Sequence, residues 1–541
     1  MVSGRWISSR RWVIAGLMTR GPIQSWAPYA AGGLVLVCAV LATARNIRKH
    51  ARQLVLREKR EAYLPTALAK LQATASPRPD IAARELSPRD LAHMRFFIDR
   101  GLQPIDSFNG FTIIDQFQPA ALRYSLNFMQ YALAIQQCQY TPSFHGYLSK
   151  AQRNLIAKFQ DKRVWGYWIW EKLLGHFSLH FDPIGRDNIM LGGFLNLNIN
   201  LYQANTGDRC YDQPGAFQFR LNVRKTYQHS AHTINAAAVH NFKASVLALY
   251  PCEPCLAYTY CNLLGLAGVP AYDRAHGQKH FTDIRNHFRK HLDEDACYPD
   301  FTFATGICNL TGTEVRLTEG VYTEMAYAWL ANAHFPDVAQ RSWAIVRTES
   351  LSLQQDGRIK IQTKGAADNL DLGAYRKSPT TLLAITAIGA REMGDDAMAE
   401  AAMAELDRVG NPTLEDGILR YEVSSYTQSH IAIARLLRRD DWRSTILNGP
   451  PASCLTGPLL TEASYPDVLV ARAFSDGDDL QLVLYPGGTQ RRQMLGLERL
   501  RPDTRYRVEG AVTEQIIADA SGRANLSVDL EGRTPVNVLP A

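Results

Sequence analysis

The chain has 541 residues, of which 46% are hydrophobic and 21% are charged, an ordinary balance for a globular protein with room for more than one domain. Its net charge is +7, yet the basic residues concentrate around one apolar segment, which indicates a membrane surface, and no nucleic-acid-binding motif is present. The nine cysteines are scattered, which excludes a small disulfide scaffold and predicts that most are reduced.

The N-terminal part predicts a single-pass membrane anchor. Residues 1–20 form a basic segment, and residues 21–44 carry no charge and are long enough to span a bilayer. The alternative is a cleaved signal peptide, since Ala42-Thr43-Ala44 resembles a cleavage site. More positive charge follows the segment than precedes it, which favours a cytosolic main domain. The eleven flanking basic residues are Arg5, Arg10, Arg11, Arg20, Arg45, Arg48, Lys49, Arg52, Arg57, Lys59 and Arg60.

The rest of the chain divides into a connector, a long helical region and a β region. Residues 45–85 form the connector, helix-like at first and then rich in proline around residues 76–80. Over residues 86–450 apolar residues recur every three or four positions between turn signals, which predicts successive helices closing into an α/α barrel. Short alternating runs over residues 456–541 predict a small antiparallel β domain.

The segment CEPCLAYTYC, from Cys252 to Cys261, is the strongest chemical signal in the sequence. Nine residues are two and a half helical turns, so two thiols on one continuous helix would point to opposite sides. Pro254 favours a loop that carries Cys252 and Glu253, followed by a helix from about residue 256 that carries Cys261. Thiols from a loop and a helix can converge on one pocket for acid/base chemistry without a metal or cofactor.

Three other interpretations of this segment stay open. Buried cysteines often only pack, and in an oxidising compartment Cys252 and Cys261 could form a disulfide. A zinc site is the third, but a strong signature needs a second regularly spaced ligand pair, which the sequence lacks, so we expect no metal. The side chains available for zinc are Cys252, Cys255, Cys261, His276 and His280.

Seven short sequence motifs resemble motifs of the linalool dehydratase-isomerase family and occur in the same order as in that family. Together with LRYSL at Leu122, they cover roughly residues 118–435. They are KRVWGYW (162–168), DPIGRDNIM (182–190), LNLNINLYQANTGDRCY (195–211), the cysteine segment, YDRAHG (272–277), AREMGD (390–395) and LRYE (419–422). The resemblance implies an (α/α)6 barrel that forms a ring-shaped homo-oligomer with the active site at a subunit contact. Members of that family interconvert terpene alcohols and hydrocarbons without a cofactor.

By position, the resemblance implies that Cys252, Glu253 and Cys261 are catalytic. It also implies that Tyr124 in LRYS, Met190 in DNIM and Tyr322 in GVYT line the substrate pocket.

Phe194 departs from the family, whose characterised enzyme has a histidine at this position. Phenylalanine cannot transfer a proton, but its face can line an apolar pocket and stabilise a cation. The family also contributes an acidic loop from the neighbouring subunit, for which Asp106 and Asp115 are candidates, with solvated loop carboxylates as the alternative.

The sequence therefore predicts a cofactor-independent dehydratase or isomerase acting on a terpenoid-like or other apolar alcohol. In this hypothesis the thiols and Glu253 transfer protons while Tyr124 and Tyr322 bind the hydroxyl group. One alternative is an (α/α)6 glycoside-active enzyme that uses paired carboxylates among Asp182, Asp187 and Glu171. Another is a non-catalytic, membrane-tethered protein that binds apolar ligands.

Overall fold

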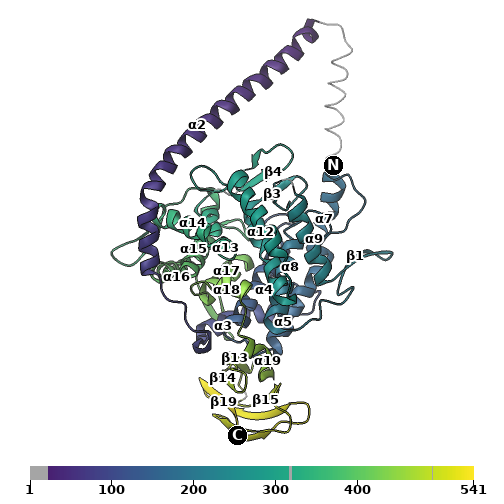
Figure 1. The fold of residues 1–541 in the computed structure, drawn as a ribbon, viewed down its shortest axis with the longest axis vertical. Coiled ribbons are helices and arrows are strands. Elements are labelled where there is room, and N and C mark those ends of the chain that lie inside the picture. Colours follow the sequence, from purple (N-terminus) through teal and green to yellow (C-terminus); the bar gives the residue numbers. More distant parts are fainter. Residues whose placement is uncertain (1–21, 246, 316–319, 490) are drawn as a thin grey trace. The chain divides into compact units, whose positions relative to one another are not determined.

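A computed structural model describes residues 22–245, 247–315, 320–489 and 491–541. The chain divides into two compact units, one comprising residues up to Tyr63 with Tyr298–Phe301, the other comprising Leu64–Cys297 and Thr302–Ala541. The described part is mainly helical with antiparallel strands after residue 458, as the sequence predicts (Figure 1). The predicted basic segment, residues 1–20, lies outside the described residues.

The first unit consists of the N-terminal part of α2 (Pro22–Thr74) and the short segment Tyr298–Phe301. The stretch Tyr29–Thr74 is long and apolar enough to cross a membrane, with a most apolar window of mean hydropathy 1.7, none of it buried. A signal sequence would have the same properties. Arg60 forms an ion pair with Asp300 at 3.7 Å.

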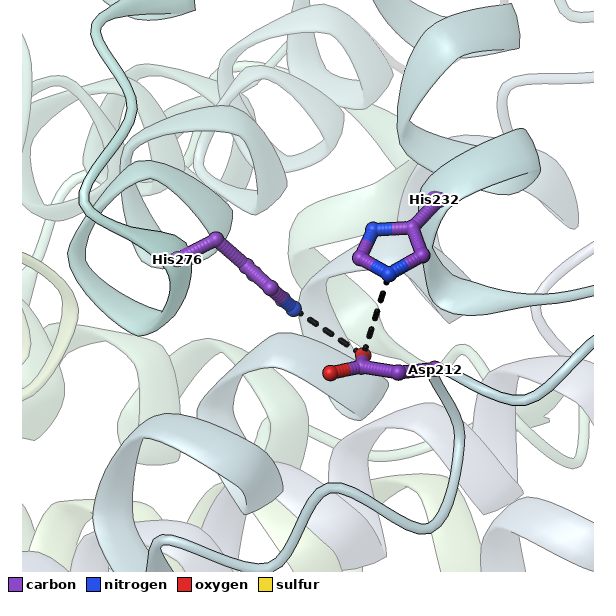
Figure 2. A group of neighbouring side chains, drawn as sticks. All are labelled: Asp212, His232 and His276. Atoms are coloured by element: carbon purple, nitrogen blue, oxygen red, sulfur yellow. Dashed lines mark hydrogen bonds and ion pairs between the residues drawn. The ribbon is translucent and has the colours of Figure 1, made fainter.

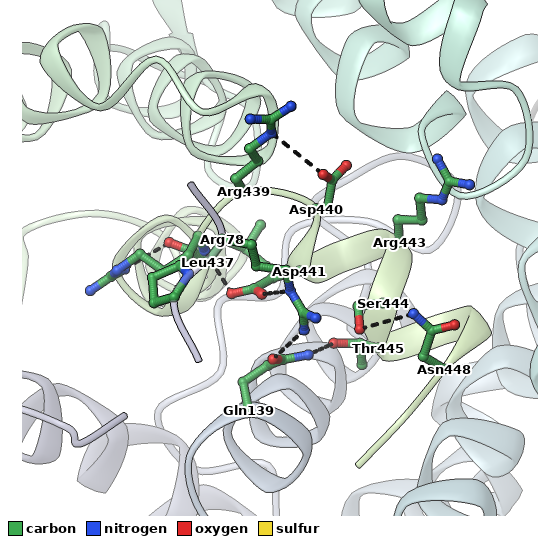
Figure 3. A network of polar contacts seen from close by, with 12 residues as sticks. Arg78, Gln139, Leu437, Arg439, Asp440, Asp441, Arg443, Ser444, Thr445 and Asn448 are labelled. Carbon is green, nitrogen blue, oxygen red and sulfur yellow. Dashed lines mark hydrogen bonds and ion pairs between the residues drawn. The ribbon is translucent and has the colours of Figure 1, made fainter. Parts of the chain in front are cut away.

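A buried polar network fixes the start of the second unit (Figure 3). Asp441, on α18 (Asp441–Leu447), is fully buried and accepts hydrogen bonds from Arg78 at 3.2 Å and Arg84 at 2.6 Å. Arg78 also donates to Gln139, which donates to Thr445 at 3.0 Å. Because a buried carboxylate must be paired, these contacts hold the predicted linker against the helical body.

Six helices of the second unit are buried along almost their whole length. Each packs on the next in the order given, and the last returns to the first. Polar side chains within them are buried as well, and several bond one another, as Asn198 does by donating to Asn127. They are α4 (Leu122–Gln139), α8 (Gly192–Thr206), α10 (Thr259–Leu266), α13 (Val321–Ala331), α15 (Thr380–Met393) and α17 (Ser425–Leu436).

The helices that pack outside these six bury one face only, as amphipathic helices do. The first of them, α3, begins with a capping box in which Ser87 and Asp90 each bond the backbone of the other. These helices are α3 (Pro88–Leu102), α5 (Gly146–Ala157), α9 (Ala231–Ala244), α12 (His280–His291), α14 (Pro336–Glu349) and α16 (Asp396–Val409). A seventh helix, α11 (Gly268–His276), is mostly buried against α8.

Short antiparallel strands interrupt the region that the sequence predicts to be almost entirely helical. The longest pair is β1 (Phe217–Asn222) with β2 (Lys225–His229), and β3 (Leu256–Tyr258) pairs with β4 (Gly306–Cys308). The remaining short strands are β5 (Glu314–Val315), β6 (Leu351–Leu353), β7 (Ile359–Ile361), β8 (Leu370–Asp371), β9 (Arg376–Lys377), β10 (Thr413–Glu415) and β11 (Ile418–Arg420).

The C-terminal strands form two antiparallel sheets, ordered β12-β15-β18 and β13-β14-β19-β16-β17. Figure 1 shows them (yellow) at the end of the second unit farthest from β3 and β4. Backbone hydrogen bonds from Ser143 to Ala473 and from His145 to Leu460 join this region to the helices. The strands are β12 (Leu459–Glu462), β13 (Val468–Phe474), β14 (Leu480–Pro486), β15 (Arg492–Glu498), β16 (Arg505–Glu509), β17 (Gln515–Ile517), β18 (Ala524–Asp529) and β19 (Thr534–Pro540).

Candidate active site

The cysteine segment folds as a tight turn followed by a short strand and a helix. The Cys252 N–H donates to the Leu256 carbonyl at 2.7 Å, and the Leu256 N–H donates to the Glu253 carbonyl at 3.0 Å. Cys255 takes a left-handed conformation with φ of 68°, which closes the turn. The chain then forms β3, and α10 begins at Thr259, so the prediction of a helix from about residue 256 is wrong by three residues.

This turn brings the two thiols together, as expected for a loop thiol and a helix thiol. Cys252 is fully buried and Cys261 is 6% exposed. Burial raises the pKa of Cys252 well above its usual value, and a hydrogen bond and charge from the neighbouring Cys261 raise it further. Cys252 is therefore a protonated thiol at neutral pH. Both cysteines are free thiols rather than a disulfide.

Glu253 lies beside the thiols with its carboxyl group largely out of water. Burial, opposed by the charge of Arg123 and aided by that of Glu171, raises its pKa to about 7. Its Oε2 is buried without a hydrogen-bond partner in the described structure. A carboxyl group with a pKa near neutrality and a free oxygen is suited to both proton donation and proton acceptance.

Arg123 is a site residue that the sequence analysis missed. Its guanidinium lies 4.1 Å from the centre of the Tyr167 ring and donates to the Phe117 carbonyl at 2.8 Å. A cation in the first turn of α4 opposes the helix dipole, so it needs such partners. That unfavourable position, next to Tyr124, is the signal that could have identified it.

The predicted substrate-binding residues meet in an aromatic cluster. The Tyr124 hydroxyl donates to the Met190 sulfur at 2.9 Å, and its ring meets that of Phe194 edge-on at 6.1 Å between centres. Tyr322 reaches the cluster through Tyr426, whose hydroxyl lies 2.8 Å from its own. All five side chains are buried.

Tyr426 and its neighbour His430 also escaped prediction. The His430 ring lies 4.3 Å from those of both Phe128 and Tyr426. Burial lowers the pKa of His430 to about 4, so its imidazole is neutral at physiological pH. His430 therefore does not take the place of the histidine that the family's characterised enzyme has at the position of Phe194.

Within a single chain, Asp106 lies outside the aromatic cluster. It is exposed, and its backbone carbonyl accepts a hydrogen bond from Arg163 at 2.7 Å. Asp115 instead caps its own loop, accepting from the Phe117 N–H at 2.7 Å and bonding Tyr375. A role for Asp106 in a neighbouring subunit's site stays a prediction.

The carboxylates of the glycoside hypothesis have other partners. Asp182 lies 3.0 Å from His229, and Asp187 lies 2.6 Å from His176. Asp187 and Asn188 both have positive φ, which keeps the backbone out of a helix, so α8 begins only at Gly192. The zinc set is not assembled either, because His276 lies with Asp212 and His232.

An exposed apolar stretch borders the cysteine turn. Trp170, Leu174, Phe177 and Leu179 are 59%, 68%, 89% and 79% exposed. They flank Gly175, where an added Cβ would lie 2.4 Å from the Pro254 ring, so this stretch packs directly on the turn. Exposed apolar side chains thus lie beside the cysteine turn, which suits the binding of an apolar partner or ligand.

Comparison with known proteins places these residues in one family. The sequence model of linalool dehydratase/isomerase matches residues 123–427, more than half of the chain. The match includes the cysteine turn and the aromatic cluster, and it excludes the N-terminal helix and the C-terminal sheets. The chain therefore belongs to the linalool dehydratase/isomerase family.

Proposed function

We propose that this protein is a cofactor-independent dehydratase and isomerase of an apolar, terpenoid-type allylic alcohol. The observation that carries the proposal is the buried pair of Cys252 and Cys261 next to Glu253, a carboxyl group with a pKa of about 7 and an unpartnered oxygen. Family membership supports the reaction class, and the buried aromatic cluster supports the substrate class.

In this mechanism the protonated Glu253 donates its proton to the substrate hydroxyl, and the carbon–oxygen bond breaks to release water. The resulting allylic cation lies among the faces of Tyr124, Phe194 and Tyr426, which stabilise positive charge. A proton from the carbon next to the cation then passes through the thiol pair to the Glu253 carboxylate. Alcohol becomes diene plus water, and the enzyme returns to its starting state.

Isomerisation uses the same cation. Water adds to the other end of the allylic system, and the proton that it loses returns to Glu253. Removing the aromatic faces or the acid would therefore slow both reactions, because they share the step that breaks the carbon–oxygen bond.

The finer architecture belongs to the same proposal. We infer that the six buried helices form the inner layer of an (α/α)6 barrel, supported by their cyclic packing. We further propose a homo-oligomer with the site at a subunit contact, and a membrane anchor formed by α2 that leaves the helical unit in the cytosol.

Substituting one thiol tests the mechanism. We expect Cys252→Ala to lower kcat at least about a hundredfold, since acid/base groups contribute on that scale, while the far-UV circular dichroism stays unchanged. The assay follows turnover of a panel of terpene alcohols in deuterated buffer, where proton return to carbon introduces deuterium.

Cys210→Ala is the matched control, because Cys210 is an exposed thiol outside the cluster. It should leave turnover and deuterium incorporation unchanged. Full activity of Cys252→Ala would disprove the mechanism. A wild-type protein that binds these alcohols without turnover or exchange would favour the non-catalytic alternative.

A further inference from the structure

Asp212, His232 and His276 converge from three separate segments (Figure 2). Asp212 lies in the turn that follows α8, His232 in the first turn of α9, and His276 at the end of α11. One ligand atom from each lies within 4.8 Å of the others. The Asp212 Oδ1 is 2.9 Å from the Nε2 of His276 and 3.9 Å from that of His232.

These separations suit one small cation. Ligand atoms about 2.1 Å from a tetrahedral ion lie roughly 3.4 Å from one another, between the two observed distances. A modest rotation of His232, whose side chain is 47% exposed, would equalise them.

Tyr272 orients both imidazoles. Its hydroxyl lies 2.7 Å from the Nδ1 of His232, and its backbone carbonyl lies 3.1 Å from the Nδ1 of His276. Its ring also stacks on that of His276, 4.1 Å between centres. Both Nε2 atoms therefore face Asp212, with their other nitrogens held by hydrogen bonds, as in histidines that bind metals.

The contacts of His276 leave its Nε2 suited to a metal ion. The Tyr272 carbonyl can only accept, so the tautomer that satisfies its contact with Nδ1 carries the hydrogen there and leaves the Nε2 lone pair free. That nitrogen faces the Asp212 Oδ1, another acceptor, at 2.9 Å. A bound metal ion would accept an electron pair from each of these two atoms.

We propose that Asp212, His232 and His276 bind a divalent transition-metal ion of the zinc class. Two imidazole nitrogens and one carboxylate oxygen are ligands that Zn²⁺ prefers, and solvent supplies the remaining position beside the exposed His232. Gln203 supports the carboxylate by donating to Oδ1 at 2.8 Å. The ion links the Asp212 turn to α9 and α11.

This site is separate from the cysteine cluster. Phe194 lies near the start of α8, whereas Gln203, which touches Asp212, lies nine residues further on. Nine residues of α-helix span roughly 13 Å. The sequence analysis, which expected no metal, grouped His276 with the cysteines and left out Asp212 and His232.

The test uses the full-length chain in detergent, stripped of metal by a chelator and titrated with Zn²⁺ in a calorimeter. We expect one equivalent to bind and the Tm to rise until that equivalent is bound. With Co²⁺, the visible absorption should develop without the intense near-ultraviolet thiolate band, since nitrogen and oxygen are the ligands. This spectrum tests the wild-type protein even where a variant folds poorly.

Matched variants locate the ion. We expect His276→Ala and Asp212→Asn to lose tight binding, and Tyr272→Phe, which removes the hydroxyl that orients His232, to weaken it about 10- to 100-fold. His280→Ala, close to Tyr272 but outside the group, should bind as wild type. A thiolate band, unchanged binding in His276→Ala, or no saturable Zn²⁺ binding would overturn the proposal.

Discussion

Glu253 combines a nearby positive charge with a largely buried carboxyl group. Burial is the largest influence on its carboxyl group, and it prevails over the nearby positive charge of Arg123. Its pKa of about 7 means that both protonation states are populated at physiological pH. A substrate hydroxyl can therefore meet either an acid or a base at this position without any change in the surrounding protein.

The proposed role of Glu253 as the acid sets the direction of the pH dependence. Because burial raises the pKa, the proton-donating form is fully present below pH 7 and is lost as the pH rises above it. We expect kcat/KM to fall above about pH 7, and Glu253→Gln to lose activity about 10²- to 10⁴-fold at every pH. Steady-state assays of the wild type and of Glu253→Gln from pH 5.5 to 9 measure both effects.

Glu171 provides the control for that experiment. Its charge contributes to the raised pKa of Glu253, so Glu171→Gln should move the fall in kcat/KM to lower pH while kcat at pH 6 changes little. If kcat/KM increases through pH 7, or if its fall above pH 7 remains in Glu253→Gln, another group donates the proton.

Sequence reasoning identified most of the clustered residues and missed those defined by long-range partners. Cys252 and Cys261 could be placed together because proline dictates a break between loop and helix. Arg123 was missed because its partners, which include backbone carbonyls of the preceding loop, have no sequence signature, and only its unfavourable position in the first turn of α4 pointed to them. The place of Tyr426 in the cluster was missed for the same reason, because only the fold brings its hydroxyl group next to that of Tyr322.

At the scale of elements, two glycines set the distance between α8 and α10. A Cβ on Gly193 would lie 3.3 Å from the Gly265 Cα, and one on Gly265 would lie 2.6 Å from the Ile189 side chain. Gly193 precedes Phe194, and Gly265 lies one helical turn after Cys261. The close approach of these backbones therefore fixes how near the aromatic face lies to the thiol.

Widening that contact should disturb both stability and chemistry. We expect Gly265→Ala to lower the free energy of unfolding by about 1–3 kcal/mol, as overpacking in a tight core does, and to reduce kcat. Chemical denaturation and steady-state kinetics measure the two effects.

Gly185→Ala is the comparison, since a Cβ there would meet nothing nearer than 3.8 Å. Gly185→Ala should change neither the free energy of unfolding nor kcat. Wild-type stability in Gly265→Ala would mean that α8 and α10 can separate without cost, contrary to the packing described above.

The elements themselves were predictable to different degrees. Long apolar periodicity predicted the buried helices, and alternation predicted the C-terminal strands. The short hairpins, such as β1 with β2, were missed because strands of two to six residues obtain their stability from neighbouring elements rather than from their own pattern.

At the scale of the whole molecule, the membrane anchor that we propose for the apolar part of α2 would determine where the protein works. Leu34, Leu36 and Leu41 are each at least 64% exposed, as expected for side chains that contact lipid. An apolar alcohol partitions into a bilayer, so an enzyme held at the membrane meets its substrate at a raised local concentration.

Charges introduced into this helix should release the protein from membranes. We expect the double substitution Leu36→Arg with Val37→Arg to abolish co-flotation with phospholipid vesicles, since each arginine costs roughly 2.5–3.5 kcal/mol at the centre of a membrane helix. Leu54→Arg, beyond the uncharged stretch, should float as wild type. Continued flotation of the double variant would point to another membrane-binding surface.

The cyclic packing of the six buried helices has a consequence for synthesis on the ribosome. The first of them, α4, buries all its residues, and one of the helices that covers it is α17. Some three hundred residues must emerge after α4 before α17 leaves the exit tunnel. The side of α4 that α17 covers therefore stays exposed while the intervening residues are translated, when such surfaces aggregate or recruit chaperones. Tyr426, which completes the aromatic cluster, is made last, so a truncated chain has the thiols but an unfinished site.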